Sequence, residues 1–413
     1  MKKRLLFAHY QMNVGGVESA LLATLRLLSP DKYDITLMLM RLGGPLFDEI
    51  PPYVKVMEIP LTPIGDYRRR CGWSATVKES LRTCRFWHAV RTLALKAHWL
   101  LFYKWRGICF GDLEAFQINA SVDVAKLPRG FDFAFAYFGG ILNGDFVSRY
   151  YGGESITCIW FHNEGTRFKY RRYREVTRRF DHVFACSKSL ADFFNRVLSR
   201  GDICFETMPH YVDLEEYRRR VGMGEGLPVP PDGYRRILTV ARLDYQKGID
   251  IAIEAATQLK KSGSRFVWYV VGGGGYIEKY ESIRDERGLT DSFVFLGERR
   301  NPFPCYRDCD VYVQPSRVEA YCLTIAEARA FSKPIVTTAT VGGSEQIEDG
   351  KTGLVVPVGD AEALAAAVGR LLSDEAFRRR LSESLVLVNF DQIEETKKAW
   401  NALLTEKREE MRK

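Results

Sequence analysis

The chain has 413 residues, of which 46% are hydrophobic and 27% are charged, and its formal net charge is +8. This length predicts two domains that can each bury a core, and the composition excludes a disordered chain. The apolar runs are short and interrupted by charges, so we expect no membrane-spanning helix. Nine cysteines without regular spacing argue against a disulfide framework. The first apolar stretch is too short for a secretion signal, which predicts a cytoplasmic protein.

The first half of the chain alternates between short apolar runs and stretches with helical periodicity. Such alternation is typical of a parallel α/β sheet. We expect the first helix at residues 17–28, directly after the glycine pair Gly15-Gly16. The expected strands are residues 4–9, 34–39, 131–137, 156–161 and 182–186.

Residues 65–110 interrupt this alternation and form a basic insertion. They contain ten arginines and lysines but only two acidic residues, so this segment alone accounts for the net charge of +8. Its apolar residues follow one helical face only in part, which leaves two interpretations: a helix packed on its own domain, or a basic, Trp-rich helix on a membrane surface. A second basic cluster occupies residues 167–179. Such clusters suit anionic lipid, a phosphate-bearing acceptor or nucleic acid.

The alternation restarts after a glycine- and proline-rich stretch at residues 222–231, which suggests a linker. Expected strands follow at 236–240, 266–271, 293–296, 311–314 and 334–338, with helices at 250–260, 276–287 and 324–331. This pattern predicts a second doubly wound domain, and such sheets bind ligands at the carboxyl ends of their strands. We place the two domains at residues 1–212 and 213–391, with a charged C-terminal helix at 392–413 that packs back on the first domain.

Two cations follow the strand expected at 236–240. Arg242 and Lys247 stand in a loop just ahead of an expected helix. Cationic side chains beside unbonded helix amides form an anion site that fits a diphosphate. Taken alone, loop cations of this kind are more often simply solvated.

Glycines and carboxylates follow the next strands of this domain. Gly272 to Gly275 permit a close approach of backbone to a ligand, although a flexible turn is an equal interpretation. Glu319 and Glu327 stand two helical turns apart, so both carboxylates can face the same side. Paired acids can bind the vicinal hydroxyls of a sugar and a ribose, and the alternative is a pair of solvated helix acids.

These residues in combination closely resemble glycosyltransferase family 4. The resemblance covers residues 234–357 and rests on Arg242, Lys247, the spacing Glu319-x7-Glu327, Gly342-Gly343-x-Glu345 and Asp349-Gly350-x-x-Gly353-Leu354-Val355. The first half is similar more loosely, through Gly15-Gly16-Val17-Glu18, Trp160-Phe161-His162-Asn163 and Ser187-Lys188-Ser189.

The resemblance implies a role for each candidate residue. Arg242 and Lys247 would neutralise the leaving diphosphate, Glu319 would contact the donor sugar, and Glu327 would bind the ribose. His162 would contact the sugar from the acceptor side, although a lone histidine is otherwise more often a core residue. The remaining donor-binding candidates would act through their backbones: Gly15, Gly16, Gly272, Gly273, Cys322 and Leu323.

The fold that the resemblance implies is α/β of the GT-B type, in which two Rossmann-like domains face each other across a cleft. Residues 1–212 would bind the acceptor and 213–391 the nucleotide-sugar. The implied enzyme is a retaining hexosyl- or N-acetylhexosaminyl-transferase without cofactor, with a UDP-sugar as donor. Asp308-Cys309-Asp310 has the form of a metal-binding motif, but we interpret it as structural and predict no metal site. Retention by front-face attack rests on the analogy with the family.

The chain departs from the family pattern around the expected donor site. Ala320-Tyr321-Cys322 replaces the usual Gly-Phe-Gly, Ser332 replaces a glycine, and residues 210–213 replace Asn-Gly-Val-Asp. The added side chains narrow the pocket beside the diphosphate. None of these changes removes a charged residue, so we expect an active enzyme.

The expected partners are a nucleotide-sugar and a polysaccharide or lipid-linked acceptor in surface glycan biosynthesis. The basic segment 68–106 adds an anionic membrane surface, which would hold the enzyme on the inner face of the cell membrane. Nucleic acid is not expected, because no RNA-binding platform or recognition helix is evident. A non-catalytic sugar-nucleotide-binding protein of the same fold is the alternative.

Overall fold

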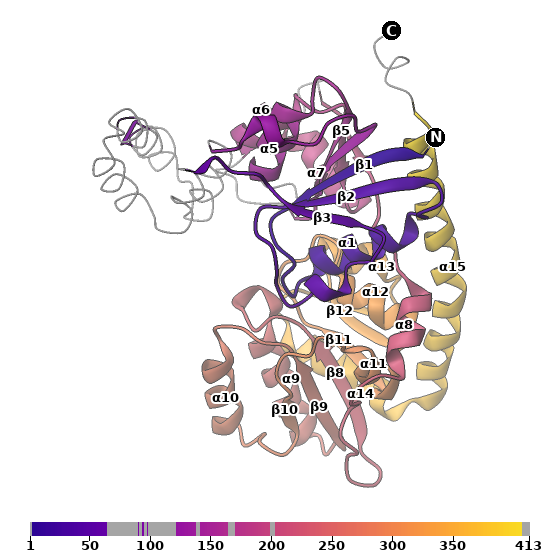
Figure 1. Ribbon diagram of the computed structural model, residues 1–413. Coiled ribbons are helices and arrows are strands. Elements are labelled where there is room, and N and C mark those ends of the chain that lie inside the picture. The colour runs from indigo at the N-terminus through magenta and orange to yellow at the C-terminus, as the bar shows by residue number, and fades with distance from the viewer. Residues whose placement is uncertain are drawn as a thin grey trace. The chain divides into compact units, whose positions relative to one another are not determined.

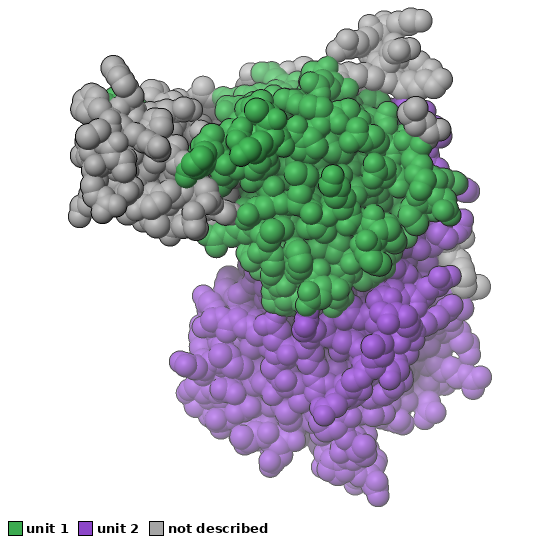
Figure 2. Space-filling view, in the orientation of Figure 1, with its two compact units in different colours: residues 1–185, 191–207, 407–413 green, residues 186–190, 208–406 purple. Residues whose placement is uncertain are grey.

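The computed structural model describes residues 2–63, 90, 93, 94, 97, 121–137, 141–163, 170–198 and 203–406. The expected basic insertion therefore lies almost entirely outside the described residues. The chain divides into two compact units, coloured separately in Figure 2. Unit 1 comprises residues 1–185, 191–207 and 407–413, and unit 2 comprises residues 186–190 and 208–406.

Unit 1 is built on a parallel sheet of seven strands in the order β3-β2-β1-β4-β5-β6-β7. The strands are β1 (Lys3–His9), β2 (Tyr33–Leu39), β3 (Lys55–Glu58), β4 (Phe133–Ala136), β5 (Ile156–Phe161), β6 (His182–Ala185) and β7 (Phe205–Thr207). The helices are α1 (Gly16–Leu27), α5 (Ile141–Tyr150), α6 (Tyr170–Thr177) and α7 (Lys188–Val197), with 3-10 turns η1 (Phe47–Glu49) and η4 (Val124–Lys126). Parallel sheets are buried on both faces, which explains why four consecutive residues of β1, Leu5 to Ala8, are fully buried.

The two ends of the segment between β3 and β4 are joined to each other. Leu61 and Val122 form an antiparallel bridge. The Thr62 N–H donates to the Ser121 carbonyl at 2.8 Å, and the Asp123 N–H donates to the Pro60 carbonyl at 2.8 Å. These contacts hold residues 60–62 beside residues 121–123.

Unit 2 contains a parallel sheet of six strands in the order β10-β9-β8-β11-β12-β13 (Figure 1). The strands are β8 (Arg235–Val240), β9 (Phe266–Val271), β10 (Phe293–Phe295), β11 (Val311–Gln314), β12 (Ile335–Thr338) and β13 (Leu354–Val356). The helices are α8 (Leu214–Val221), α9 (Ile249–Lys261), α10 (Ile277–Glu286), α11 (Phe303–Asp308), α12 (Leu323–Ala330), α13 (Val341–Gln346), α14 (Ala361–Ser373) and α15 (Glu375–Thr405), with the 3-10 turn η6 (Tyr245–Lys247). The strand order reverses at β8, and β9 and β11 flank it, so the carboxyl ends of β8 and β11 mark the switch point where such folds bind ligands.

Two apolar clusters cover the two faces of the sheet in unit 2. Residues of α9 and α14 pack on one face, and residues of α11 and α12 pack on the other. A polar link crosses the buried middle of the sheet, because the Trp268 indole donates to the Thr239 hydroxyl at 3.0 Å and this hydroxyl donates to the Val313 carbonyl at 2.7 Å. This link ties β9, β8 and β11 together beneath the switch point.

The doubly wound α/β architecture of both halves is confirmed. The C-terminal helix differs in extent from the expected 392–413, because α15 begins at Glu375 and runs as one helix to Thr405. The Asp374 carboxylate caps it by accepting the Phe377 N–H at 2.8 Å. Within unit 2, α15 packs on α12 and α14; its packing on the first domain stays a prediction. Of the described helices, none has the length and apolar character needed to span a bilayer.

Ser332 follows α12 with φ of 51° and occupies the left-handed region, where residues with a Cβ are strained. We predict that Ser332→Gly stabilises the protein by roughly 0.5–1 kcal/mol, since the relieved strain exceeds the entropy that glycine adds to the unfolded chain. Chemical denaturation measures the change. Ser332→Ala is the control, because it keeps the strain and should give no gain; equal effects of both substitutions would contradict the explanation.

Candidate active site

Four of the predicted residues in unit 2 lie at the carboxyl end of its sheet. Arg242 follows β8, Lys247 ends η6, Gly272 follows β9 and Glu319 lies in the loop after β11. The strands β9, β8 and β11 are direct neighbours (Figure 1). The topology therefore brings these segments to the same edge, which is the edge that the sequence predicted for a ligand.

Lys247 and Glu319 form a buried ion pair. The Lys247 Nζ lies 2.7 Å from the Glu319 Oε1, and the two side chains are 18% and 8% exposed. Burial lowers the pKa of the Lys247 ammonium, but the Glu319 carboxylate outweighs burial, and the pKa is raised overall. Lys247 therefore keeps its charge at neutral pH. The sequence had assigned the two residues to separate parts of the donor and did not predict their pairing.

Arg242 is the exposed cation of this edge. Its side chain is 69% exposed and its Nη2 lies 3.3 Å from the Asp244 Oδ2. The Asp244 carboxylate also accepts the Lys247 N–H at 3.2 Å, which closes the turn that carries Lys247. The loop after β8 thus presents one exposed and one buried cation, and the role of Arg242 on the diphosphate stays a prediction.

Glu327 is buried in α12 at 8% exposure and receives a hydrogen bond from another helix. The Tyr306 hydroxyl of α11 donates to the Glu327 Oε2 at 2.7 Å. Burial raises the pKa of Glu327 to about 7, while the bond from Tyr306 opposes this shift. The carboxyl group therefore titrates near neutral pH, and Tyr306 is a site residue that the sequence reasoning missed.

The glycines after β9 have a packing role. Gly272 has φ of 146° and Gly274 has φ of 153°. A Cβ on Gly272 would collide with the Ala241 carbonyl oxygen, and one on Gly274 would collide with the Leu243 backbone. The glycines let this loop pass directly over the end of β8. Donor binding by Gly272 and Gly273 stays a prediction.

Cys322 stands at the start of α12 with φ of 69°. The left-handed backbone there explains why the related family usually has glycine at this position. The Cys322 Sγ lies 3.3 Å from the Thr324 Oγ1 and is buried. Burial raises the pKa of the thiol, so this cysteine stays neutral. The predicted contact of Cys322 and Leu323 with phosphate involves their backbones and stays a prediction.

The unit 1 candidates follow two strands of its sheet that are separated by one other strand. Gly15 and Gly16 follow β1, and His162 follows β5; β4 lies between these strands. The His162 Nε2 lies 2.5 Å from the Tyr137 carbonyl oxygen, which assigns the proton to this nitrogen. Burial lowers the pKa of His162 to about 3, so the ring is neutral at physiological pH. Such a histidine can bind a sugar hydroxyl but cannot supply a positive charge.

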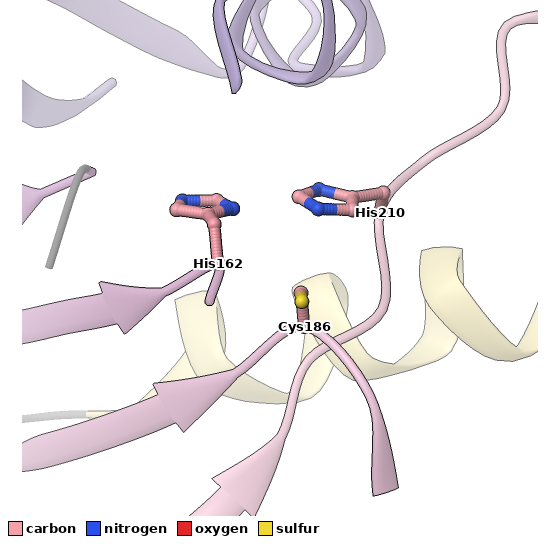
Figure 3. A group of neighbouring side chains, drawn as sticks. All are labelled: His162, Cys186 and His210. Atoms are coloured by element: carbon pink, nitrogen blue, oxygen red, sulfur yellow. The ribbon is translucent and has the colours of Figure 1, made fainter. Parts of the chain in front are cut away.

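Three side chains of types that can ligate metals are drawn in Figure 3: His162, Cys186 and His210. His162 belongs to unit 1, whereas Cys186 and His210 belong to unit 2, so the three do not form a site within one unit. Burial raises the pKa of the Cys186 thiol, which opposes the thiolate that a metal requires. The His210 ring packs edge-on against Tyr321, with their centroids 5.1 Å apart.

The acids of the Asp308-Cys309-Asp310 motif hold backbone segments in place. The Asp308 Oδ2 accepts the Leu227 N–H at 3.0 Å, and the Asp310 Oδ2 accepts the Arg236 N–H at 2.8 Å. Asp308 also binds the guanidinium of Arg307 at 2.7 Å. These contacts are structural, and the first of them fixes the glycine- and proline-rich stretch that the composition had suggested as a linker.

The carboxylate of Glu345 binds backbone within unit 2. Its two oxygens accept the N–H groups of Lys188 at 2.8 Å and Ser189 at 2.9 Å. The neighbouring Ser187 hydroxyl donates to the Ala320 carbonyl at 2.9 Å, next to the loop that carries Glu319. The serine turn and the Gly342-Gly343-x-Glu345 turn, which the sequence singled out separately, are thus directly bonded.

Residues 228–385 match the sequence model of the family described as "Glycosyl transferases group 1". Among curated proteins, the chain is 33% identical over 150 residues to alpha-D-kanosaminyltransferase of Streptomyces kanamyceticus, an alignment that covers 36% of this chain and 39% of the relative. It is 32% identical over 188 residues to a GDP-mannose-dependent phosphatidylinositol monomannoside mannosyltransferase of Mycolicibacterium smegmatis, covering 41% of this chain and 47% of the relative. The chain thus aligns with less than half of the length of each relative.

The fold has close counterparts among solved structures. Anabaena HepE in complex with UDP-glucose superposes with a TM-score of 0.69 at 16% identity, over 97% of this chain and 99% of that chain. Sucrose-phosphate synthase of Thermosynechococcus elongatus gives a TM-score of 0.69 at 17% identity, over 98% of both chains. At such low identity these neighbours show the fold alone, which is GT-B. Over residues 228–385, the chain is thus similar to the group 1 glycosyltransferases.

Proposed function

We propose that the protein is a retaining, metal-independent glycosyltransferase that transfers a hexosyl or N-acetylhexosaminyl group from a UDP-sugar. The buried ion pair of Lys247 and Glu319 at the switch point of unit 2 carries this proposal. The pair lies inside the segment that matches the group 1 family. Structural neighbours crystallised with UDP or UDP-glucose support the choice of donor.

The chemistry follows from the charges at this edge. Departure of a nucleoside diphosphate from a sugar leaves negative charge on the diphosphate and positive charge on the ring, so a fixed ammonium aimed at the phosphates stabilises the transition state. Lys247 carries three N–H donors, of which Glu319 takes one. Among the described residues, the hydrogen bonds to the Glu319 side chain converge on its Oε1, so its Oε2 can accept from a sugar hydroxyl.

The acceptor that we propose is a polysaccharide or lipid-linked glycan of the cell surface. Relatives named for colanic acid biosynthesis in Salmonella typhimurium and for lipopolysaccharide core biosynthesis in Rhizobium leguminosarum support this class. A cytoplasmic location, peripheral on the inner face of the membrane, would bring the enzyme to such acceptors. The basic residues 68–106 proposed for membrane binding lie outside the described residues.

Incubation with a panel of nucleotide-sugars in EDTA tests the function. We expect turnover of a UDP-sugar with retention of anomeric configuration, followed by NMR, and loss of turnover in Glu327→Ala. Turnover of GDP-sugars only would contradict the proposed donor, and activity that EDTA abolishes and Mn²⁺ restores would contradict metal independence. Binding of a nucleotide-sugar without turnover would favour the non-catalytic alternative.

Removal of the buried cation should impair the chemical step. We expect Lys247→Met to lower kcat/KM by about 10²–10³, the usual effect of removing one charge-stabilising donor. Because this change leaves Glu319 buried and unpaired, Lys247→Met/Glu319→Gln should recover thermal stability but not activity. Lys261→Met, at an exposed lysine in the last turn of α9, is the matched control. Activity of Lys247→Met within threefold of wild type would rule out the proposed role.

The raised pKa of Glu327 predicts that donor binding depends on pH. If the ionised carboxylate accepts ribose hydroxyls, donor affinity should rise by about tenfold from pH 6 to pH 8, since the group titrates at a pKa of about 7. Calorimetry of UDP binding measures this rise, which Glu327→Gln should abolish and Glu362→Gln, at an exposed site in α14, should preserve.

Whereas donor affinity should rise with pH, the raised pKa of Glu327 should make the stability of the donor-free protein fall with pH. A carboxyl whose pKa is higher in the folded state contributes stability below its unfolded value of 4.5, and this contribution is lost as pH rises through about 7. Wild type should therefore lose stability over this window relative to Glu327→Gln. A constant difference in melting temperature between the two proteins would show that the carboxyl is not shifted.

A further inference from the structure

A chain of buried hydrogen bonds leads from two hydroxyl groups to the carboxylate of Glu319. Gln314, the last residue of β11, stands at its centre and is 1% exposed. Its Oε1 accepts from the Tyr312 hydroxyl at 2.5 Å and from the Thr324 hydroxyl at 3.0 Å. Its Nε2 donates to the Ser316 Oγ at 2.8 Å, and Ser316 donates to the Glu319 Oε1 at 2.8 Å.

The Glu319 carboxylate, at which this series of hydrogen bonds ends, determines which atom is the donor in each bond. A carboxylate only accepts hydrogen bonds, so Ser316 must donate to Glu319 and must itself receive the proton of Gln314. The Gln314 Nε2 also lies 3.5 Å from the Glu319 Oε1. If the Gln314 amide were reversed, its oxygen would face the Glu319 carboxylate. The hydroxyls of Tyr312 and Thr324 fix the observed orientation, because both donate to the Gln314 Oε1. All the donors therefore point toward Glu319.

The network joins two parts of the proposed donor site. At one end, Glu319 holds the Lys247 ammonium at 2.7 Å. At the other, Thr324 lies in the first turn of α12, the helix that also carries Glu327. Gln314 uses both its donor and its acceptor atoms to connect them. Through Ser316, the position of the Gln314 amide helps to determine where the Oε1 of Glu319 lies.

We propose that Gln314 is a positioning residue of the donor site, which holds the carboxylate of Glu319 oriented toward Lys247 through Ser316. This role rests on the proposed function, because Glu319 and Lys247 are there assigned to the donor. Gln314 acts through Glu319 and needs no contact with the substrate. A fully bonded amide in a buried site is rigid, and rigidity of this kind keeps a charged pair in a productive geometry.

Several titratable groups face this network. Lys247 from η6 is charged, since its pKa is raised. Burial raises the pKa values of Tyr312 in β11, Tyr306 in α11 and Cys322 before α12, so these groups stay neutral. Glu327 in α12 binds Tyr306 and does not bond to Gln314 in the described contacts.

The decisive variant is Gln314→Glu, which keeps shape but replaces the donating amide by a carboxyl group. Two carboxylates about 3.5 Å apart do not both ionise, so the pair should retain one proton at low pH and donate it through Ser316 as the amide does. Once this proton is lost at higher pH, repulsion should displace Glu319. The activity of Gln314→Glu relative to wild type should thus fall by up to about tenfold per pH unit above the pKa of the pair.

Two further variants separate this role from a structural one. Gln314→Met removes the hydrogen bonds without adding charge and should lower kcat by roughly ten- to hundredfold with the pH profile of wild type. Gln258→Glu, in α9, introduces the same charge away from the network and should leave activity unchanged. Melting temperatures of all variants verify that they fold.

Each outcome of this experiment is informative. A ratio of Gln314→Glu to wild-type activity that falls with pH supports the inference, and a ratio that is flat with pH overturns it while wild-type turnover still upholds the proposed function. Absence of turnover by wild type across the nucleotide-sugar panel would overturn the proposed function, and the positioning role with it. Gln314→Met with wild-type kcat would overturn the inference alone.

Discussion

The ion pair between Lys247 and Glu319 is the interaction on which the site of unit 2 depends. Two opposite charges removed from water are tolerated only when their geometry is good and their remaining atoms are hydrogen-bonded. The fold meets this condition by placing η6 after β8 and the Glu319 loop after β11, on adjacent strands. The hydrogen bond from Ser316 then satisfies the carboxylate from the other side. The strand order therefore brings the two segments that carry these opposite charges together at the switch point of the sheet.

The two buried carboxylates of this site have different neighbours. Glu319 has a cation and a hydroxyl at its Oε1. Glu327 has the hydroxyl of Tyr306 but no cation in bonding distance among the described contacts, and burial raises its pKa to about 7. One carboxylate is therefore paired with a cation and the other titrates near neutral pH, although the sequence presents them as equivalent acids.

The sequence predicted the sheets and most of their strands because apolar runs and turn residues are local signals. It missed β3, β7 and β13, which are short edge strands, and it placed the start of the last helix beyond Asp374, whose capping role was a readable signal. It also identified Lys247 and Glu319 by type and position. It could not predict their pairing or the role of Gln314, because these contacts join residues far apart in the chain, 72 positions in the case of the ion pair. In the sequence, the signal for this hydrogen-bond network was a polar residue, Gln314, at the end of an apolar strand.

The bridge between Leu61 and Val122 has a consequence for how this protein can vary. The bridge and the hydrogen bonds beside it hold residues 60–62 next to residues 121–123, between the strands β3 and β4 of the same sheet. The entropy of closing such a loop grows only with the logarithm of its length, about 0.6 kcal/mol for each doubling. By this relation, a change in the number of residues between two ends that are already joined alters the free energy of folding only slightly. The contacts of residues 60–62 with 121–123 therefore allow relatives of this protein to differ in length between β3 and β4 while they keep the same sheet.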